Sequence, residues 1–241
     1  MYIKTKALVI REVKYKESDK ILTLLSPEHG KISAFANRAL SKNSKLSAPT
    51  QLFAYSEFVL VENKGKYTVN EAACIDFFQP MRGDIAAIAL AAYFASVADE
   101  LSQTDFQTDA LLNMCLNCFY AMSTQKKPLE IIKAVFELRA AMLAGYMPDL
   151  EAVTPQSTTY FDLENGVLTG QRGLHGRTVE VSPDTVAAME YILNCPEKRI
   201  FAFNLAVEPL KQLARVAEEF LACHLDKPLR TLDFYKKVSM V

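Results

Sequence analysis

Hydrophobic and polar residues alternate along the first 75 residues of the chain in the manner of short β-strands. Five segments are rich in β-branched and aromatic residues: residues 5–13, 19–26, 30–37, 53–62 and 66–75. Turn-forming clusters separate them. In the fourth segment apolar residues occupy both faces, which indicates that one face lines a core and the other is covered or bent. Five short strands without an intervening helix predict a small closed barrel, because closure removes exposed strand edges.

The hydrophobic period changes after Pro80. Residues 84–101 are almost wholly apolar and Ala-rich, which predicts a helix at the centre of a helical unit. Thr104, three residues before Gln107, has the spacing of a capping box and predicts the start of a second helix that includes Phe106. Three further segments have helical periodicity: residues 128–143, 183–194 and 203–224.

Residues 147–181 interrupt the helical pattern. Within them Asn165 and Gly166 predict the turn of a β-hairpin. The segment contains no cysteine, and its His175 lies in a Gly-rich loop without the spacing of metal ligands. The five cysteines of the chain are an odd number in apolar surroundings, which favours a reducing compartment. Cys115 and Cys118 have C-x-x-C spacing in an apolar helical segment, which favours buried thiols over a metal or redox site.

The sequence lacks the motifs of catalysis and of membrane insertion. It contains no P-loop, no G-x-S-x-G and no H-E-x-x-H, and its acidic pairs lie on helix surfaces. We therefore expect a binding protein that is not an enzyme and needs no cofactor or metal. No apolar stretch has the length and flanks of a membrane span, and the N-terminus has no leader pattern, so we expect a cytoplasmic protein.

Charge is distributed unevenly along the chain. Residues 1–70 contain 12 Lys and Arg against 6 Asp and Glu, whereas the remaining 171 contain 15 against 22. A basic module suits a polyanion, because cations neutralise phosphates and interleaved aromatic rings stack on unpaired bases. The segment 37–47 adds a basic loop between two strands. The candidate DNA-binding residues are Arg11, Lys14, Lys16, Lys20, Lys31, Phe35, Arg38, Lys42, Lys45, Lys64 and Lys66. An ordinary exposed loop and a buried Phe35 are the alternative.

The amino-acid sequences of several segments resemble those of the RecO family of recombination mediators. The matching segments are residues 18–20, the turn 28–32, the basic loop followed by Pro49, Phe53 and Glu57, then residues 136–139, 145–146, 148–150 and 227–234. The resemblance implies an α+β protein with an OB-fold β-barrel followed by an α-helical domain. It places an OB-fold DNA-binding domain at 1–78 and a helical domain at 79–241, with a small β-hairpin insertion around 147–181. Many family members carry four zinc-binding cysteines there. This chain lacks these zinc ligands, and His175 alone cannot replace them, so we expect no zinc.

The resemblance also implies a function in DNA repair and homologous recombination. Members bind single-stranded and double-stranded DNA, anneal strands, and with RecR help to load RecA on SSB-coated DNA. We expect such a protein to be associated with the nucleoid. In this family the helical domain receives the acidic, Phe-ended tail of SSB, for which Lys133 and Arg139 are candidates. An intradomain ion pair is the alternative for Arg139. A non-catalytic protein-interaction adaptor, whose barrel binds a protein partner, is the competing function.

Overall fold

The computed structural model describes residues 1–104, 106–124, 126–151, 158–173 and 177–239. The chain divides into two compact units. Unit 1 comprises residues 1–124 and the C-terminal segment from residue 229, and unit 2 comprises residues 125–228. The expected domain division at residue 78 stays a prediction, since compactness does not say which segment folds by itself. No described helix is long and apolar enough to cross a membrane.

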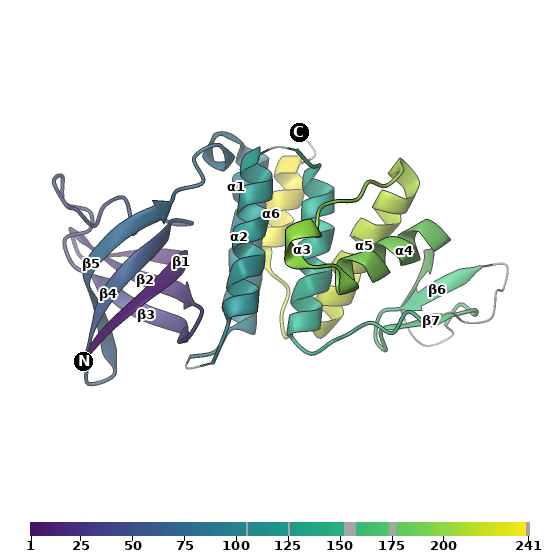
Figure 1. The fold of residues 1–241 in the computed structure, drawn as a ribbon, viewed down its shortest axis with the longest axis horizontal. Helices are drawn as coiled ribbons and strands as arrows, with labels where there is room; N and C mark the ends of the chain where they lie inside the picture. The colour runs from purple at the N-terminus through teal and green to yellow at the C-terminus, as the bar shows by residue number, and fades with distance from the viewer. Residues whose placement is uncertain (105, 125, 152–157, 174–176, 240–241) are drawn as a thin grey trace. The chain divides into compact units, whose positions relative to one another are not determined.

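Unit 1 opens with a closed five-stranded barrel (Figure 1). Its strands are β1 (Tyr2–Tyr15), β2 (Asp19–Ser26), β3 (Gly30–Ala36), β4 (Tyr55–Asn63) and β5 (Lys66–Asp76). They are hydrogen-bonded in the order β1-β2-β3-β5-β4, and every pair is antiparallel except β3 and β5. The barrel predicted from the five apolar segments is confirmed, and with it the OB-fold.

Strand β1 closes the barrel because it pairs with two neighbours in succession. Its first half pairs with β4 and its second half with β2. A bulge between Val9 and Arg11 lies where the strand passes from one partner to the other, as bulges bend strands in barrels. Alternate residues point inward and form the apolar core of the barrel: Ala7, Val9, Leu22, Leu24, Ile32, Ala34, Ala36, Ala39, Ala54, Phe58, Leu60 and Val69.

The turn between β2 and β3 is attached to the segment that precedes the second helix. Gly30 has φ +63°, and a Cβ at this position would lie 2.1 Å from the carbonyl oxygen of Gln103. The Lys31 N–H donates to that same oxygen. Thr108 extends the attachment, since its N–H donates to the carbonyl of Pro27. Only glycine fits this close approach of two backbones.

The attachment explains why the predicted capping box is wrong. Thr104 forms a β-bridge with Gly30 and does not cap a helix. Helix α2 (Asp109–Thr124) begins five residues later, and Phe106 is an exposed residue outside it. The local spacing fitted a helix start, but the tertiary pairing with the barrel turn takes precedence over it.

Three helices complete unit 1: α1 (Ile85–Leu101), α2 and α6 (Arg230–Ser239), with a short 3-10 helix η1 (Met81–Gly83) before α1. The carboxylate of Asp84 accepts the N–H groups of Ala86 and Ala87 and caps α1. Helix α1 packs against both α2 and α6, as its apolar sequence predicts. Phe119 of α2 makes edge-on contacts with the buried Phe53 and Phe78. Helix α6 was not predicted from the sequence.

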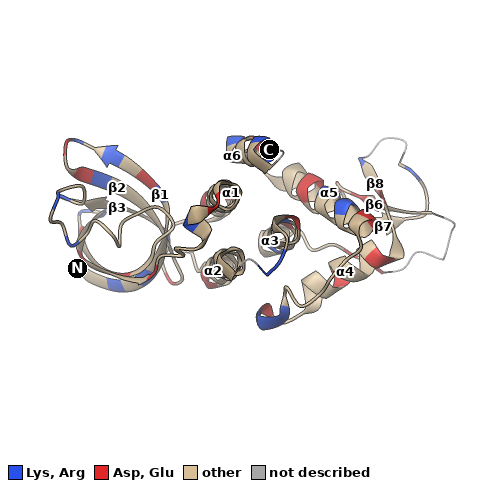
Figure 2. Cartoon of the chain, turned by 90° about the horizontal axis from the view of Figure 1, so that it is seen from above, with Lys and Arg blue, Asp and Glu red and all other residues tan. Residues whose placement is uncertain are grey.

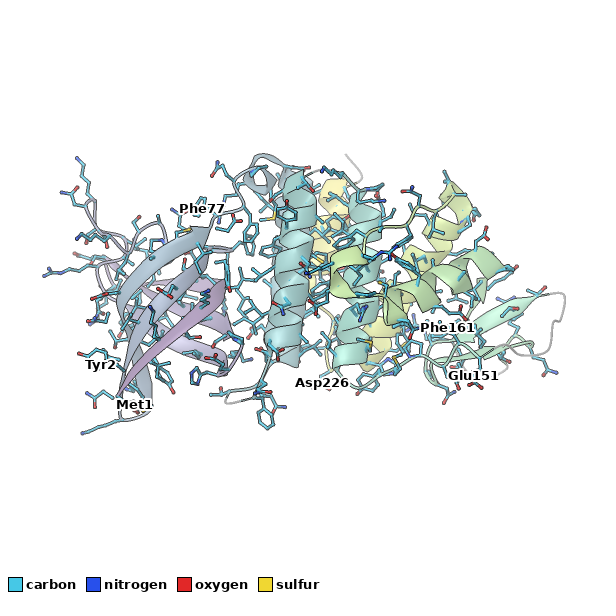
Figure 3. All side chains as sticks on the ribbon, in the orientation of Figure 1. Met1, Tyr2, Phe77, Glu151, Phe161 and Asp226 are labelled. Carbon is cyan, nitrogen blue, oxygen red and sulfur yellow. The ribbon has the colours of Figure 1, made fainter. Side chains whose placement is uncertain are left out.

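Unit 2 combines three α-helices with a small antiparallel sheet. The helices are α3 (Leu129–Leu143), α4 (Pro183–Asn194) and α5 (Val207–His224), with a 3-10 turn η2 (Glu197–Arg199). The strands β6 (Thr159–Asp162), β7 (Val167–Thr169) and β8 (Thr178–Val181) lie in the order β7-β6-β8. The hairpin predicted at Asn165-Gly166 is confirmed, and β8 adds a strand that was not expected. The ring of Phe161 in β6, labelled in Figure 3, meets the ring of Phe220 in α5 edge-on, with the ring centroids 5.3 Å apart. His175 lies outside the described residues.

Candidate nucleic-acid interface

The outer surface of β1, β2 and β3 carries a row of apolar and aromatic side chains. Cross-strand pairing aligns Val13 with Ile21 and Ile21 with Phe35. Tyr15 lies at the end of this row, and its ring meets Phe35 edge-on with centroids 5.8 Å apart. Val13 and Tyr15 are 45% and 41% exposed, and Phe35 and Ile21 are half-buried. Such a surface offers ring faces and edges on which unpaired bases can stack.

Cations border this row along the second half of β1 and at the β1–β2 turn. Arg11, Lys14 and Lys16 are all exposed, and none of them forms an ion pair with a described residue. The Lys16 Nζ lies 5.3 Å from the centre of the Tyr15 ring, within the range of a cation–π contact. Figure 2 shows Lys and Arg recurring around the barrel, with acidic positions between them.

The basic loop between β3 and β4 is folded into successive turns. Backbone hydrogen bonds join Ser44 to Ser41 and Ser47 to Ser44. At its start the loop is tied to the β1–β2 turn, because the Leu40 N–H donates to the carbonyl of Ser18. The loop's three cations are exposed and form no ion pair with a described residue: Arg38, Lys42 and Lys45. This arrangement places the basic loop next to the aromatic row.

The β4–β5 hairpin supplies the remaining cations. Lys64 and Lys66 are exposed, and Lys64 occupies the tip of a two-residue hairpin turn. The parallel pairing of Ala34 with Tyr67 brings the start of β5 to the edge of β3. The hairpin is therefore next to the same three-stranded face as the aromatic row. In OB-folds this face and its flanking loops are the surface that binds oligonucleotides.

Two of the predicted DNA contacts are instead engaged in ion pairs. The side chain of Lys20 is buried, and its Nζ lies 2.7 Å from Glu12 Oε2. The Nζ of Lys31 lies 2.9 Å from Asp99 Oδ1 and also donates to the Asp99 carbonyl. These lysines hold structural contacts, so we leave them out of the interface. Tyr15, which the sequence shows as an aromatic residue interleaved with the cations but which was not among the candidate DNA-binding residues, joins the interface. It lies two residues from Val13 on the same strand face.

The two candidates for a peptide site in unit 2 differ in their surroundings. Lys133 is buried, and its Nζ lies 2.8 Å from Glu137 Oε1 and 2.8 Å from Glu218 Oε2. Burial acts to lower the pKa of Lys133, but the two carboxylates outweigh it and the pKa is raised. Its charge is committed to these carboxylates, so Lys133 does not suit a second, anionic ligand.

Arg139 lies beside a pocket. Its guanidinium donates to the carbonyl of Cys195, while its Nε is buried without a hydrogen-bond partner. The neighbouring pocket has a volume of about 310 Å³ and is lined by Tyr191, Asn194, Cys195, Pro196 and Arg199. A pocket with an aromatic ring and an arginine can accept both an apolar group and a carboxylate.

The buried thiols show no sign of metal binding. Cys115 and Cys118 are fully buried, and burial raises the pKa of Cys115 to about 12 and that of Cys118 well above its usual value. A metal ligand must be a thiolate, which this environment disfavours. No group of three or more metal-ligating side chains occurs in the part of the chain that the structure describes.

Comparison with known proteins places the chain in a family. The family model "Recombination protein O N terminal" matches residues 1–78, and "Recombination protein O C terminal" matches residues 82–233. The chain belongs to the RecO family. A DNA repair protein RecO of Acetivibrio thermocellus is 32% identical over 100% of this chain and 98% of its own length. That of Clostridium novyi is 36% identical over 96% of this chain and 93% of its own.

Membership confirms the resemblance seen in the sequence. RecO proteins act in DNA repair and recombination as mediators that are not catalysts, as expected from the absence of a catalytic motif. The match covers both units, so the barrel and the helical region belong together in one family architecture. What the family name leaves open is which surface meets DNA.

Proposed function

We propose that this RecO protein binds single-stranded DNA on the outer face of β1, β2 and β3. The observation that carries the proposal is the aromatic row of the exposed Tyr15 and the half-buried Phe35, bordered by cations without ion pairs. Phosphates of the strand contact the cations while its bases stack on the rings. The cations of this interface are Arg11, Lys14, Lys16, Arg38, Lys42, Lys45, Lys64 and Lys66.

The wider function follows from this binding. In the same proposal the protein also binds double-stranded DNA, anneals complementary strands, and acts with RecR on SSB-coated DNA to help load RecA. Contacts to phosphates rather than to base edges serve this purpose, because a mediator must act on strands of any sequence. We place this activity in the cytoplasm, at the nucleoid.

The test is fluorescence anisotropy of a labelled single strand, titrated with protein at several salt concentrations. We expect the logarithm of the binding constant to fall linearly with the logarithm of salt concentration. Replacing Lys42 and Lys45 by Ala together should flatten that slope by up to about two units. The matched control is Lys198→Ala, which removes an exposed cation of unit 2 and should leave the slope unchanged. Binding that does not depend on salt would refute the proposal.

A second variant tests the aromatic part of the interface. Tyr15→Ala removes an exposed ring without removing a charge. We expect affinity to fall by roughly fivefold or more, since stacking contributes about 1–3 kcal/mol per base, while the salt slope stays the same. If instead oligonucleotides fail to bind at modest salt and the barrel retains a protein partner in pull-downs, the adaptor function is the correct one.

The Arg139 pocket supports a second candidate function, binding of the SSB tail. Arg199 would contact a carboxylate of the tail and Tyr191 the terminal phenylalanine, while Arg139 positions the pocket wall through its hydrogen bond to the Cys195 carbonyl. Titration of a labelled tail peptide tests this. Arg199→Gln should weaken binding by about tenfold, whereas Arg172→Gln, in an exposed loop of the same unit, should not change it. Equal affinity of both variants and the wild type would exclude this pocket.

A further inference from the structure

Five residues other than glycine have a left-handed backbone in the described part of the chain. They are Lys16, Arg38, Phe53, Lys64 and Phe78, with φ between 48° and 66°. This conformation is unfavourable for any residue with a Cβ, and glycine is its usual occupant. Asparagine and aspartate tolerate it best among the others, yet neither occurs at these five positions. Each position therefore carries a side chain at a cost to stability.

Packing accounts for the two phenylalanines. Phe53 and Phe78 are both buried, and their rings meet Phe119 with centroids 5.6 Å and 5.4 Å apart. Glycine at either position would remove a large apolar contact from unit 1. The gain from burying each ring exceeds the cost of the backbone conformation.

Packing does not account for the three cations. Lys16, Arg38 and Lys64 are exposed, and none forms an ion pair with a described residue. Each stands at a different turn beside the face proposed to bind DNA: Lys16 between β1 and β2, Arg38 two residues after the end of β3, and Lys64 between β4 and β5. Lys16 makes a cation–π contact with the ring of Tyr15, but at an exposed site such a contact is weak and does not explain why glycine is absent. Arg38 and Lys64 form no ion pair with a described residue.

At two of these turns, hydrogen bonds that do not involve the cationic side chains hold the backbone. The Arg38 N–H donates to Asp19 Oδ1 at 2.8 Å, which ties the exit of β3 to the start of β2. In the hairpin, the N–H of Gly65 donates to Glu62 Oε1 at 2.9 Å. Neither bond involves the side chain of Arg38 or Lys64, so a glycine at these two positions would fit the same backbone with less strain. We expect the same at Lys16, whose φ of 54° is also left-handed.

We propose that Lys16, Arg38 and Lys64 are the principal phosphate contacts of the barrel, retained at unfavourable positions for their charge. The inference rests on the proposed function, and its ligand is the phosphate backbone of a single strand. Rigid turns hold the three cations around the aromatic row, so little backbone entropy is lost when the strand binds. Strain located at a binding surface is the pattern expected when function, and not stability, selects the residue.

Paired substitutions separate the charge from the strain. Alanine keeps the Cβ and the strained backbone but removes the charge, whereas glycine removes both. We expect the triple alanine and triple glycine variants to lose affinity equally, with the salt slope of single-strand binding reduced by about two units. The triple glycine variant should also melt higher than the triple alanine variant, by about 2 °C per site. Anisotropy and thermal unfolding of the full chain measure both effects.

Two controls calibrate these measurements. Lys198→Ala removes an exposed cation outside the barrel and should change neither affinity nor melting temperature. Lys6→Gly, within strand β1, should lower the melting temperature, because glycine at an ordinary strand position is unfavourable.

The outcomes distinguish this inference from the proposed function. Wild-type protein without salt-dependent binding refutes the proposed function and the inference with it. If the wild type binds and both triple variants keep the affinity and the salt slope of the wild type, the inference alone is overturned. A triple glycine variant that is no more stable than the triple alanine variant also overturns it, because the cations then stand at no cost.

Discussion

Replacing Lys133 by methionine should destabilise unit 2 strongly. The ammonium group lies 2.8 Å from one oxygen each of Glu137 and Glu218, and the side chain of Glu137 is 0% exposed. Methionine has a similar length but no charge, so Glu137 keeps a buried carboxylate without this cation. Breaking a buried pair in this way costs about 3–5 kcal/mol, which lowers the melting temperature by roughly 10 °C.

Urea and thermal unfolding, followed by circular dichroism at neutral pH, measure this loss. Lys198→Met, an exposed cation of the same unit, is the matched control and should stay within about 0.5 kcal/mol of the wild type. The double variant Lys133→Met with Glu137→Met should recover most of the loss, because it removes both buried charges. A single Lys133→Met variant within about 1 kcal/mol of the wild type would refute the reasoning.

The same network has a defined pH dependence. The pKa of Lys133 in the folded protein is raised above its ordinary value of 10.5, because the carboxylates outweigh the effect of burial. A raised pKa means that the stabilisation is complete below the unfolded value and is lost as pH rises through the folded one. The wild type should therefore lose stability above about pH 10.5, a loss that Lys133→Met does not show.

Three further outcomes follow from the structure. Gly30→Ala should cost at least about 2 kcal/mol in urea unfolding, since its Cβ would lie 2.1 Å from a carbonyl oxygen, whereas Gly65→Ala, with open space, should cost about 1 kcal/mol. A thiol reagent at neutral pH should modify the exposed Cys74 in the native protein and reach Cys115 and Cys118 only on unfolding; native-state labelling of the buried pair, seen by mass spectrometry, would contradict this. A chelator should leave the melting temperature unchanged, and stoichiometric zinc in the purified protein would contradict that expectation.

The barrel was predictable because its determinants are local. Alternation of apolar residues and turn clusters specify short strands without reference to the rest of the chain. Helix α6 was not predicted because it is short and only Leu232, Tyr235 and Val238 form its apolar stripe. Its other residues are polar or charged, apart from the exposed Phe234. The start of α2 was misplaced because a barrel turn 74 residues earlier pairs with Thr104 and prevents the local cap. Long-range pairing of this kind leaves no trace in a local sequence window.

Ion pairs between residues far apart in the sequence could not be predicted from local sequence either. The pairing of Lys133 with Glu137 has the (i, i+4) spacing that a helix makes visible in sequence. Its second partner, Glu218, is 85 residues away, and the partner of Lys31 is 68 residues away. Which lysines face solvent therefore depended on the tertiary structure, and this removed Lys20, Lys31 and Lys133 from the candidate sites.

The basic character of the barrel survives this correction. Of the 12 cations in residues 1–70, all of which the structure describes, Lys4, Lys20 and Lys31 form ion pairs. Two of the six acidic residues, Glu12 and Glu57, are consumed in the same pairs. Nine cations then face four carboxylates, so the excess of positive charge falls only from six to five. These nine cations lie on β1, at the β1–β2 and β4–β5 turns, at the start of β5 and in the basic loop. A single strand long enough to span these cations releases counterions at each of them and so gains binding affinity, whereas a shorter strand does not. The binding affinity should therefore depend on the length of the strand as well as on the salt concentration.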